Sequence, residues 1–134
     1  ACKTPMTHAS SDSMLLRGCA EAPPGLLRRG IAEFNAGRFY ECHETLEALW
    51  RAELAPVRAL YQGILQIGVG CYHAQRGNRV GAVAQLRKGL EHLEDLPAVC
   101  QGVDVTHLVA AGAAYLAAAE SGSVGAPPPT VEVA

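Results

Sequence analysis

The sequence predicts an all-α fold, a compact bundle of about five helices built on two helical hairpins. Three observations support this fold class. Apolar residues recur at three- and four-residue steps through most of the chain, as they do on the buried face of a helix. Glycine and proline interrupt these stretches at the intervals expected of helix ends. No segment alternates with a period of two for long enough to indicate a strand.

Length and composition indicate one folded domain. The chain has 134 residues, of which 49% are hydrophobic, and this is enough for one core at this size. We assign the helical bundle to residues 23–120. Residues 1–22 lack helical periodicity and are expected to form a flexible leader. Residues 121–134 are rich in glycine and proline and are expected to form a disordered tail.

Two helices are predicted in the first half of the bundle. Pro23 and Pro24 open the first helix, because proline in a first helical turn loses no hydrogen bond that would otherwise form. Gly37 ends that helix. The second helix extends from about Arg38 to Glu53 without an interior glycine or proline. Its apolar side consists of Cys42, Leu46, Leu49 and Trp50.

The third helix, about Pro56–Arg76, is apolar on nearly all sides, which predicts a central and buried position. It also contains several glycines, each of which costs up to about 1 kcal/mol relative to alanine in a helix interior. Small residues share one stripe at spacings of four and seven, so a neighbouring helix is expected to approach closely there. The stripe consists of Ala59, Gly63, Gly70 and Ala74.

Two further helices complete the predicted bundle. Asn78 is a good N-cap, and the fourth helix is expected to extend from it to about Glu94. The fifth helix is rich in alanine. It is expected to begin at a cap formed by Asp104 or Thr106 and to end near Glu120.

Charge and cysteine usage argue against several classes of protein. The net charge of −2 and the lack of a clustered basic face argue against a nucleic-acid partner. No apolar run approaches the roughly 20 residues of a membrane span, and no signal-peptide pattern is present. The five cysteines are odd in number and lack CxxC spacing, so neither a disulfide framework nor a zinc site is indicated. We expect a cytoplasmic protein with free thiols.

Polar residues gather on the second and third predicted helices. On the third helix, Gln62, Gln66 and His73 share one face. Unpaired polar groups on a buried helix cost roughly 1–3 kcal/mol each, so these side chains are expected to find partners on the second helix. There, His43 meets Glu47 at a four-residue step. The polar stripe beside His43 consists of Tyr40, Glu44, Glu47 and Arg51.

Three interpretations of this cluster stay open. The acids of the second helix could be a solvated face with weak ion pairs. They could instead join the glutamines in a buried structural network. They could also hold a ligand or a metal ion, since carboxylate and imidazole groups on bundle helices bind iron, manganese or zinc. The metal pattern is incomplete, because Glu47 stands where a Glu-x-x-His pair or an HExxH motif would have its histidine.

The segments that carry these residues resemble a known family. FNAGRFYECHETLEALW and YQGILQIGVGCYHAQRGNRVGAVAQLRKGLEHLE, within residues 26–94, resemble the bacterial and archaeal family of domains of unknown function numbered 309. The resemblance rests on Gly77, Asn78 and eight further positions. It implies an all-helical bundle with a shared polar cluster, and it supplies no activity. The eight positions, our candidate ligand-binding residues, are Glu41, His43, Glu44, Glu47, Trp50, Gln62, Gln66 and His73.

We expect a helical-bundle protein whose polar cluster binds a small ligand or a peptide end, or only locks two helices together. Catalytic residues and cofactor stay unassigned, since the chain has no Ser-His-Asp order, phosphate loop or nucleophile motif. An apolar helical face left uncovered would support a homo-oligomer. The alternative function is a metal-dependent hydrolase with Glu41 as its base. Its candidate metal ligands are His43, Glu44, Glu47 and His73.

Overall fold

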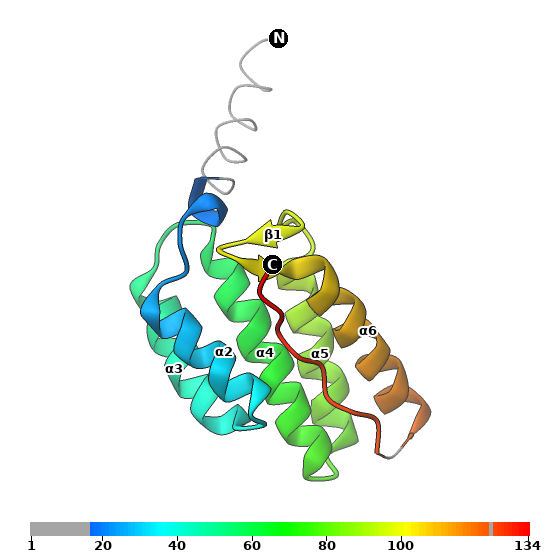
Figure 1. Cartoon of the computed structure of the whole chain (residues 1–134). Coiled ribbons are helices and arrows are strands. Elements are labelled where there is room, and N and C mark those ends of the chain that lie inside the picture. Colours follow the sequence, from blue (N-terminus) through cyan, green and yellow to red (C-terminus); the bar gives the residue numbers. More distant parts are fainter. Residues whose placement is uncertain (1–16, 124) are drawn as a thin grey trace.

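The computed structural model describes residues 17–123 and 125–134. In that part of the chain, five helices of eleven or more residues account for most of the structure (Figure 1). The all-α class that the sequence predicts is confirmed. The helices are α2 (Gly25–Asn35), α3 (Phe39–Ala52), α4 (Arg58–Gln75), α5 (Arg79–Leu93) and α6 (Val105–Ser121).

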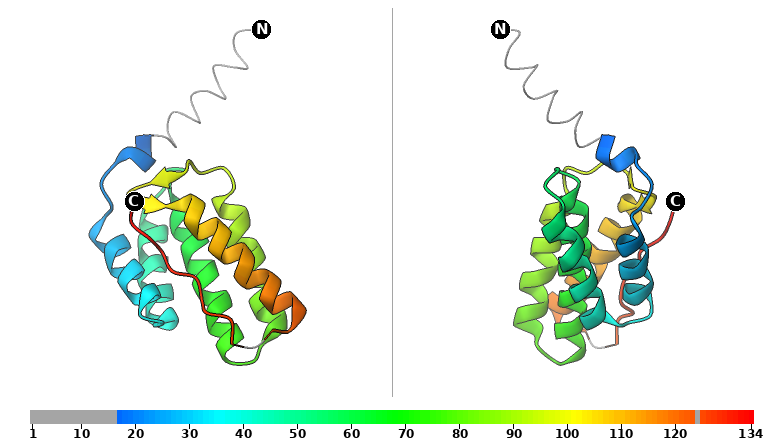
Figure 2. Two further views of the ribbon diagram at one scale, coloured as in Figure 1. Left: turned by 45° about the vertical axis from the view of Figure 1, so that its right-hand side comes forward. Right: turned by 90° about the vertical axis from the view of Figure 1, so that its left-hand side faces the viewer.

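The helices form two hairpins with a fifth helix beside them. α2 pairs with α3, and α4 pairs with α5. α4 lies between α3 and α5, while α6 packs against α5 (Figure 2). The predicted organisation as two helical hairpins is therefore confirmed. It makes α3 and α4, which carry the candidate site, direct neighbours.

Two helices begin at the predicted caps. The Asn78 side chain accepts a hydrogen bond of 3.0 Å from the backbone amide of Gly81 at the start of α5. At the start of α6, the Asp104 side chain accepts a bond of 2.9 Å from the amide of His107. Asp104, rather than Thr106, is therefore the cap of the last helix.

α4 is the most buried of the described helices, as its apolar pattern predicts. Nine of its eighteen residues are buried. A Cβ atom built at Gly63 would lie 2.5 Å from Leu93 Cδ2, and one at Gly70 would lie 2.7 Å from Leu86 Cγ. Both distances are shorter than real contacts, so only glycine allows α5 to pack this closely. The close packing of α5 against α4 therefore explains why glycine occurs at these two positions of the small-residue stripe.

A small β-hairpin joins α5 to α6. It consists of β1 (Val99–Cys100) and β2 (Val103–Asp104), which are antiparallel. The turn residues Gln101 and Gly102 have φ angles of 48° and 79°, in the left-handed region that hairpin turns use. The sequence predicts no strand because two-residue strands are too short to produce an alternating pattern.

Cys19 and Cys100 form a disulfide, so the expectation of free cysteines is wrong for this pair. They are 81 residues apart in sequence, and no short spacing pattern reveals such a pair. The backbone amide of Gln101 donates to the Cys19 carbonyl beside the bridge, at 2.6 Å. The cysteine argument for a reducing compartment therefore no longer holds. Within the described residues, no helix is both long and apolar enough to cross a membrane.

The expectations for the two ends of the chain have separate outcomes. Residues 1–16 of the expected leader lie outside the described residues. Residues 125–134, expected to be disordered, cross α4 between α2 and α6 and return to the hairpin (Figures 1 and 2). Val131 is only 2% exposed, and Val133 forms an antiparallel bridge with Val103. The burial of Val131 and the bridge at Val133 hold this segment in place, and its Gly/Pro-rich composition does not predict these contacts.

Candidate functional site

The candidate residues lie mainly along the contact between α3 and α4. Two contacts show how these antiparallel helices are aligned. At one end, the guanidinium of Arg58 lies 4.5 Å from the centre of the Trp50 ring. Toward the other end, a Cβ atom at Gly68 would lie 3.7 Å from Phe39 Cδ1. The middle of α3 therefore lies alongside the first half of α4.

His43 and Glu47 lie in this middle part of α3. At 100° per residue, His43 points in nearly the same direction as Trp50, seven residues later. Its Nε2 is 3.4 Å from Glu47 Oε2, and Arg51 Nη2 is 3.0 Å from Glu47 Oε1. The side chains of His43 and Glu47 are 35% and 33% exposed. Glu47 is thus a partly buried acceptor held between a histidine and an arginine.

Gln62 and Gln66 lie on the side of α4 that points away from the core. Gln66 is two residues from the fully buried Ile64, about half a turn around the helix. Its Oε1 is nevertheless shielded from solvent and has no hydrogen-bond partner. Nε of Arg58 is also shielded from solvent and has no hydrogen-bond partner. Nη2 of the same residue donates to the Trp50 carbonyl at 3.1 Å. Buried polar atoms without partners are rare and cost roughly 1–3 kcal/mol each.

Three of the eight predicted residues lie apart from these side chains. Glu41 Oε2 is bound by Arg38 Nε at 2.8 Å near the start of α3. Glu44 is exposed. His73 lies near the end of α4, where its Nδ1 is 3.4 Å from Asn78 Nδ2. The remaining five, together with Arg58, form what we call the α3–α4 polar face: His43, Glu47, Trp50, Arg58, Gln62 and Gln66.

Both helices contribute side chains to this face, but in the described part of the chain the predicted partners on α3 and α4 do not form hydrogen bonds or ion pairs with each other. Within residues 17–123 and 125–134, no hydrogen bond or ion pair connects Glu44 or Glu47 with Gln62, Gln66 or His73 of α4. In the same part of the chain, no three His, Cys, Asp or Glu side chains gather as a metal-binding group. The face therefore presents several hydrogen-bonding groups, and some of them have no partner within the described residues.

Arg58 is the member of this face that sequence reasoning missed. Its signal is a single positive charge at the start of an otherwise apolar helix, eight residues after Trp50. Arginine is the residue that most often stacks on tryptophan, and a short connection brings the end of one helix close to the start of the next. A search for partners of Trp50 would have identified Arg58.

Comparison with known proteins finds similarity in the part of the chain that contains α3 and α4. Residues 27–85 match the family model described as "Domain of unknown function (DUF309)", and these residues include all of α3 and α4. YpuF, an uncharacterized protein of Bacillus subtilis, is 35% identical over 66 residues. That match covers 48% of this chain but only 38% of YpuF. The segment that contains α3 and α4 is therefore similar to the DUF309 family, as its sequence motifs predict.

Proposed function

We propose that the protein is a binding module that holds a small polar ligand, or the polar end of a peptide, on the α3–α4 polar face. The observation that carries this proposal is the buried Oε1 of Gln66, which has no partner. An unpartnered buried atom lowers stability, and proteins break such local rules chiefly at functional sites. A face that only locked two helices together would be expected to bond its glutamines across them.

The ligand that fits this face both donates and accepts hydrogen bonds. Gln66 Oε1 needs an N–H or O–H donor, and Arg58 Nε offers a donor. Glu47 adds a partly buried carboxylate for a second donor group. Compounds with an amide or an amino-acid backbone carry an N–H group and a carbonyl close together. They therefore match the chemistry of the face.

Metal-dependent hydrolysis is the competing function, and it needs more ligands than this face supplies. A catalytic zinc site uses three protein ligands and one open position. On this face, only His43 and Glu47 approach each other, at 3.4 Å. Glu44 is exposed, and His73 lies toward the far end of α4. The arrangement therefore favours binding over metal-assisted catalysis.

A titration monitored by NMR tests the proposal. Free amino acids and N-acetylated amino-acid amides are added to the isotope-labelled full chain. We expect a binding compound to shift the indole signal of Trp50 and the side-chain amide signals of Gln62 and Gln66. Gln66→Leu should abolish these shifts, whereas Glu44→Gln, an exposed change on α3, should keep them. If no compound shifts these signals, or if Gln66→Leu leaves the shifts intact, the proposal is wrong.

A further inference from the structure

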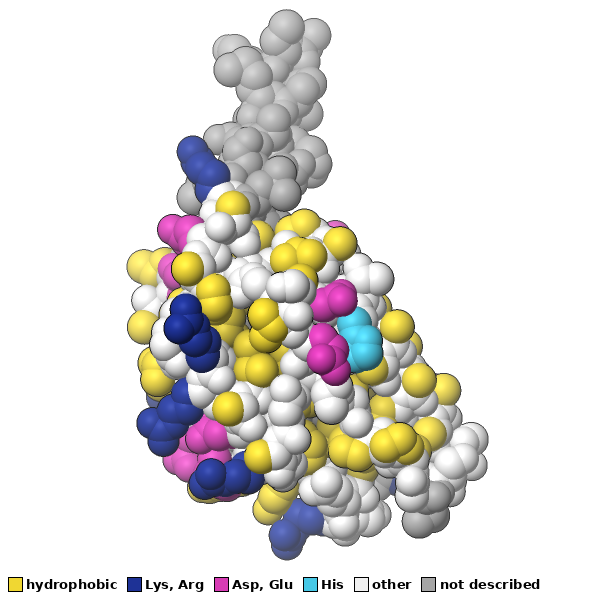
Figure 3. Space-filling model, in the orientation of Figure 1, with side chains coloured by type: hydrophobic (Ala, Val, Ile, Leu, Met, Phe, Trp, Pro, Cys, Tyr) yellow, Lys and Arg dark blue, Asp and Glu magenta, His cyan; other side chains and the backbone are white. Residues whose placement is uncertain are grey.

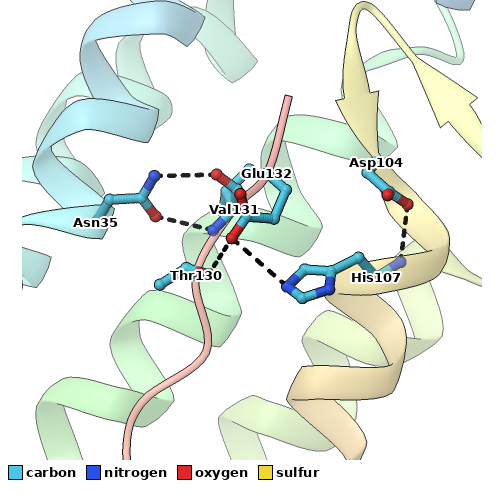
Figure 4. A network of polar contacts seen from close by, with 6 residues as sticks. All are labelled: Asn35, Asp104, His107, Thr130, Val131 and Glu132. Carbon is cyan, nitrogen blue, oxygen red and sulfur yellow. Dashed lines mark hydrogen bonds and ion pairs between the residues drawn. The ribbon is translucent and has the colours of Figure 1, made fainter. Parts of the chain in front are cut away.

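The segment 125–134 is held by contacts typical of peptide recognition. Asn35, the last residue of α2, donates from Nδ2 to the Val131 carbonyl at 2.9 Å. Its Oδ1 accepts from the Val131 amide at 2.8 Å (Figure 4). One side-chain amide thus binds both backbone groups of one residue. Such a pair recognises extended main chain whatever side chain that residue carries.

The same segment pairs with the edge of the β-hairpin. The amide of Asp104 donates to the Glu132 carbonyl at 2.9 Å, and the amide of Ala134 donates to the Gly102 carbonyl at 2.8 Å. The segment therefore extends the small sheet at β2. Adding a strand to an exposed sheet edge is a common way for a domain to bind an extended peptide.

Two side chains add sequence preference to these backbone contacts. Val131 is 2% exposed, whereas Val133, two residues later, is 70% exposed. Glu132 Oε1 lies 3.8 Å from Nε2 of His107 on α6. In the space-filling view of this side, a histidine lies next to acidic side chains (Figure 3). The surface therefore suits an apolar residue that is followed by an acid.

We propose that Asn35, the β2 edge and His107 form an acceptor site for an extended peptide from another protein. The peptide carries an apolar residue followed by an acid, and residues 130–134 occupy the site in cis. The four backbone hydrogen bonds described above do not depend on the segment's side chains, so another chain with these two side chains can replace it. The site involves α2, the hairpin and α6, and is separate from the α3–α4 polar face.

Covalent attachment explains why the segment masks the site. A short connection holds a tethered segment at a high effective concentration, so a free peptide competes poorly with it. The connection after α6 is short, and Gly122 and Gly125 adopt φ angles of 76° and 86° in it. A change that weakens the segment without altering the acceptor should therefore expose the site.

Peptide binding to the full chain tests this proposal. The probe is a fluorescent peptide with the sequence of residues 127–134, PPPTVEVA, and anisotropy is measured. Val131→Asp places a charge where the segment is buried, so this variant should bind the probe at least about tenfold more tightly than the unaltered chain. Adding Asn35→Ala should weaken that binding by about tenfold. Val133→Asp, at an exposed position of the same segment, should behave as the unaltered chain.

Three results would overturn the proposal. The first is a Val131→Asp chain that keeps its circular dichroism and melting temperature yet binds no probe. The second is equal binding by the unaltered chain. The third is a dimer seen by light scattering in place of a peptide complex, which would assign the site to a second copy. If Val131→Asp fails to fold, Val131→Ala decides: intermediate affinity supports the site, and absence of binding overturns it.

Discussion

Two glutamines with shielded polar atoms, Gln101 and Gln66, have different surroundings. Gln101, in the hairpin turn, is 3% exposed, and both of its side-chain groups are bonded. Its Oε1 accepts from the Tyr61 hydroxyl at 2.7 Å, and its Nε2 donates to the Gly18 carbonyl at 3.1 Å. Gln66, on α4, has a shielded Oε1 without a partner. Burial of a polar group alone therefore does not indicate a binding site, whereas a buried polar atom without a hydrogen-bond partner requires an explanation.

Both hydrogen-bond partners of the Gln101 side chain come from the chain itself. The Cys19–Cys100 disulfide lies beside it, and burial raises the pKa of Tyr61, so that its hydroxyl stays protonated as a donor. A fully satisfied buried network rigidifies a fold. We therefore expect the hairpin region to supply stability, and the α3–α4 polar face to give up some stability for binding.

Breaking the disulfide should have the largest effect. The bridge joins residues 81 apart, so its removal should lower the free energy of unfolding by about 2–4 kcal/mol, because the unfolded chain gains conformational freedom. Urea unfolding of the oxidised chain is compared with that of a Cys19→Ala/Cys100→Ala variant. Reductant should destabilise the former and leave the latter unchanged. Equal stability of the two proteins would show that the bridge contributes nothing.

Gln101→Leu should have the next largest effect, about 2 kcal/mol, because it leaves the Tyr61 hydroxyl and the Gly18 carbonyl without partners. Tyr61→Phe, which removes only one of these bonds, is the matched control and should cost less. Urea unfolding measures both changes, and an unchanged midpoint for Gln101→Leu would contradict the structural role.

Buried thiols should make stability fall at high pH. Burial, with a smaller contribution from Glu33, raises the pKa of Cys42 from 9.0 to about 12, and burial raises that of Cys71 similarly. Between these values the unfolded thiols lose protons and the folded ones keep them. Each thiol should therefore reduce the free energy of unfolding by up to about 1.4 kcal/mol per pH unit above pH 9. Cys71→Ala should flatten this slope, and an identical slope would contradict the assignment.

The smallest effect is expected from coupling between Glu44 and Gln66. Glu44 is exposed, so Glu44→Leu should change stability by less than about 0.5 kcal/mol. The double variant Glu44→Leu/Gln66→Leu should equal the sum of the single changes. A double-mutant cycle by urea unfolding measures this. A coupling energy above about 1 kcal/mol would instead place Glu44 in a buried network with Gln66.

Local signals in the sequence account for much of the fold. The caps Asn78 and Asp104 act within a few residues of their own positions. The packing of Gly63 and Gly70 follows from a stripe within one helix. These features are predictable because helical periodicity relates neighbours in sequence to neighbours in space.

The features that the sequence does not predict depend on contacts between residues that are far apart in the chain. The disulfide spans 81 residues, and the Asn35–Val131 pair spans 96. The candidate site shows the same limit. Periodicity places His43 and Glu44 on one helix, but the rotation of α3 against α4 leaves His43 partly buried and Glu44 exposed. That rotation is set by tertiary packing, and the sequence pattern of one helix does not predict it.

Gln66→Leu tests the central claim most directly. If the Gln66 carbonyl oxygen awaits a ligand, replacing it with an apolar group removes an unsatisfied buried atom. The free energy of unfolding should then stay unchanged or rise by up to about 1 kcal/mol, opposite in sign to Gln101→Leu. Gln62→Leu, on the same face, provides the comparison for added apolar surface. A loss of stability as large as that of Gln101→Leu would show that Gln66 is a structural residue, and would contradict the binding role of the α3–α4 polar face.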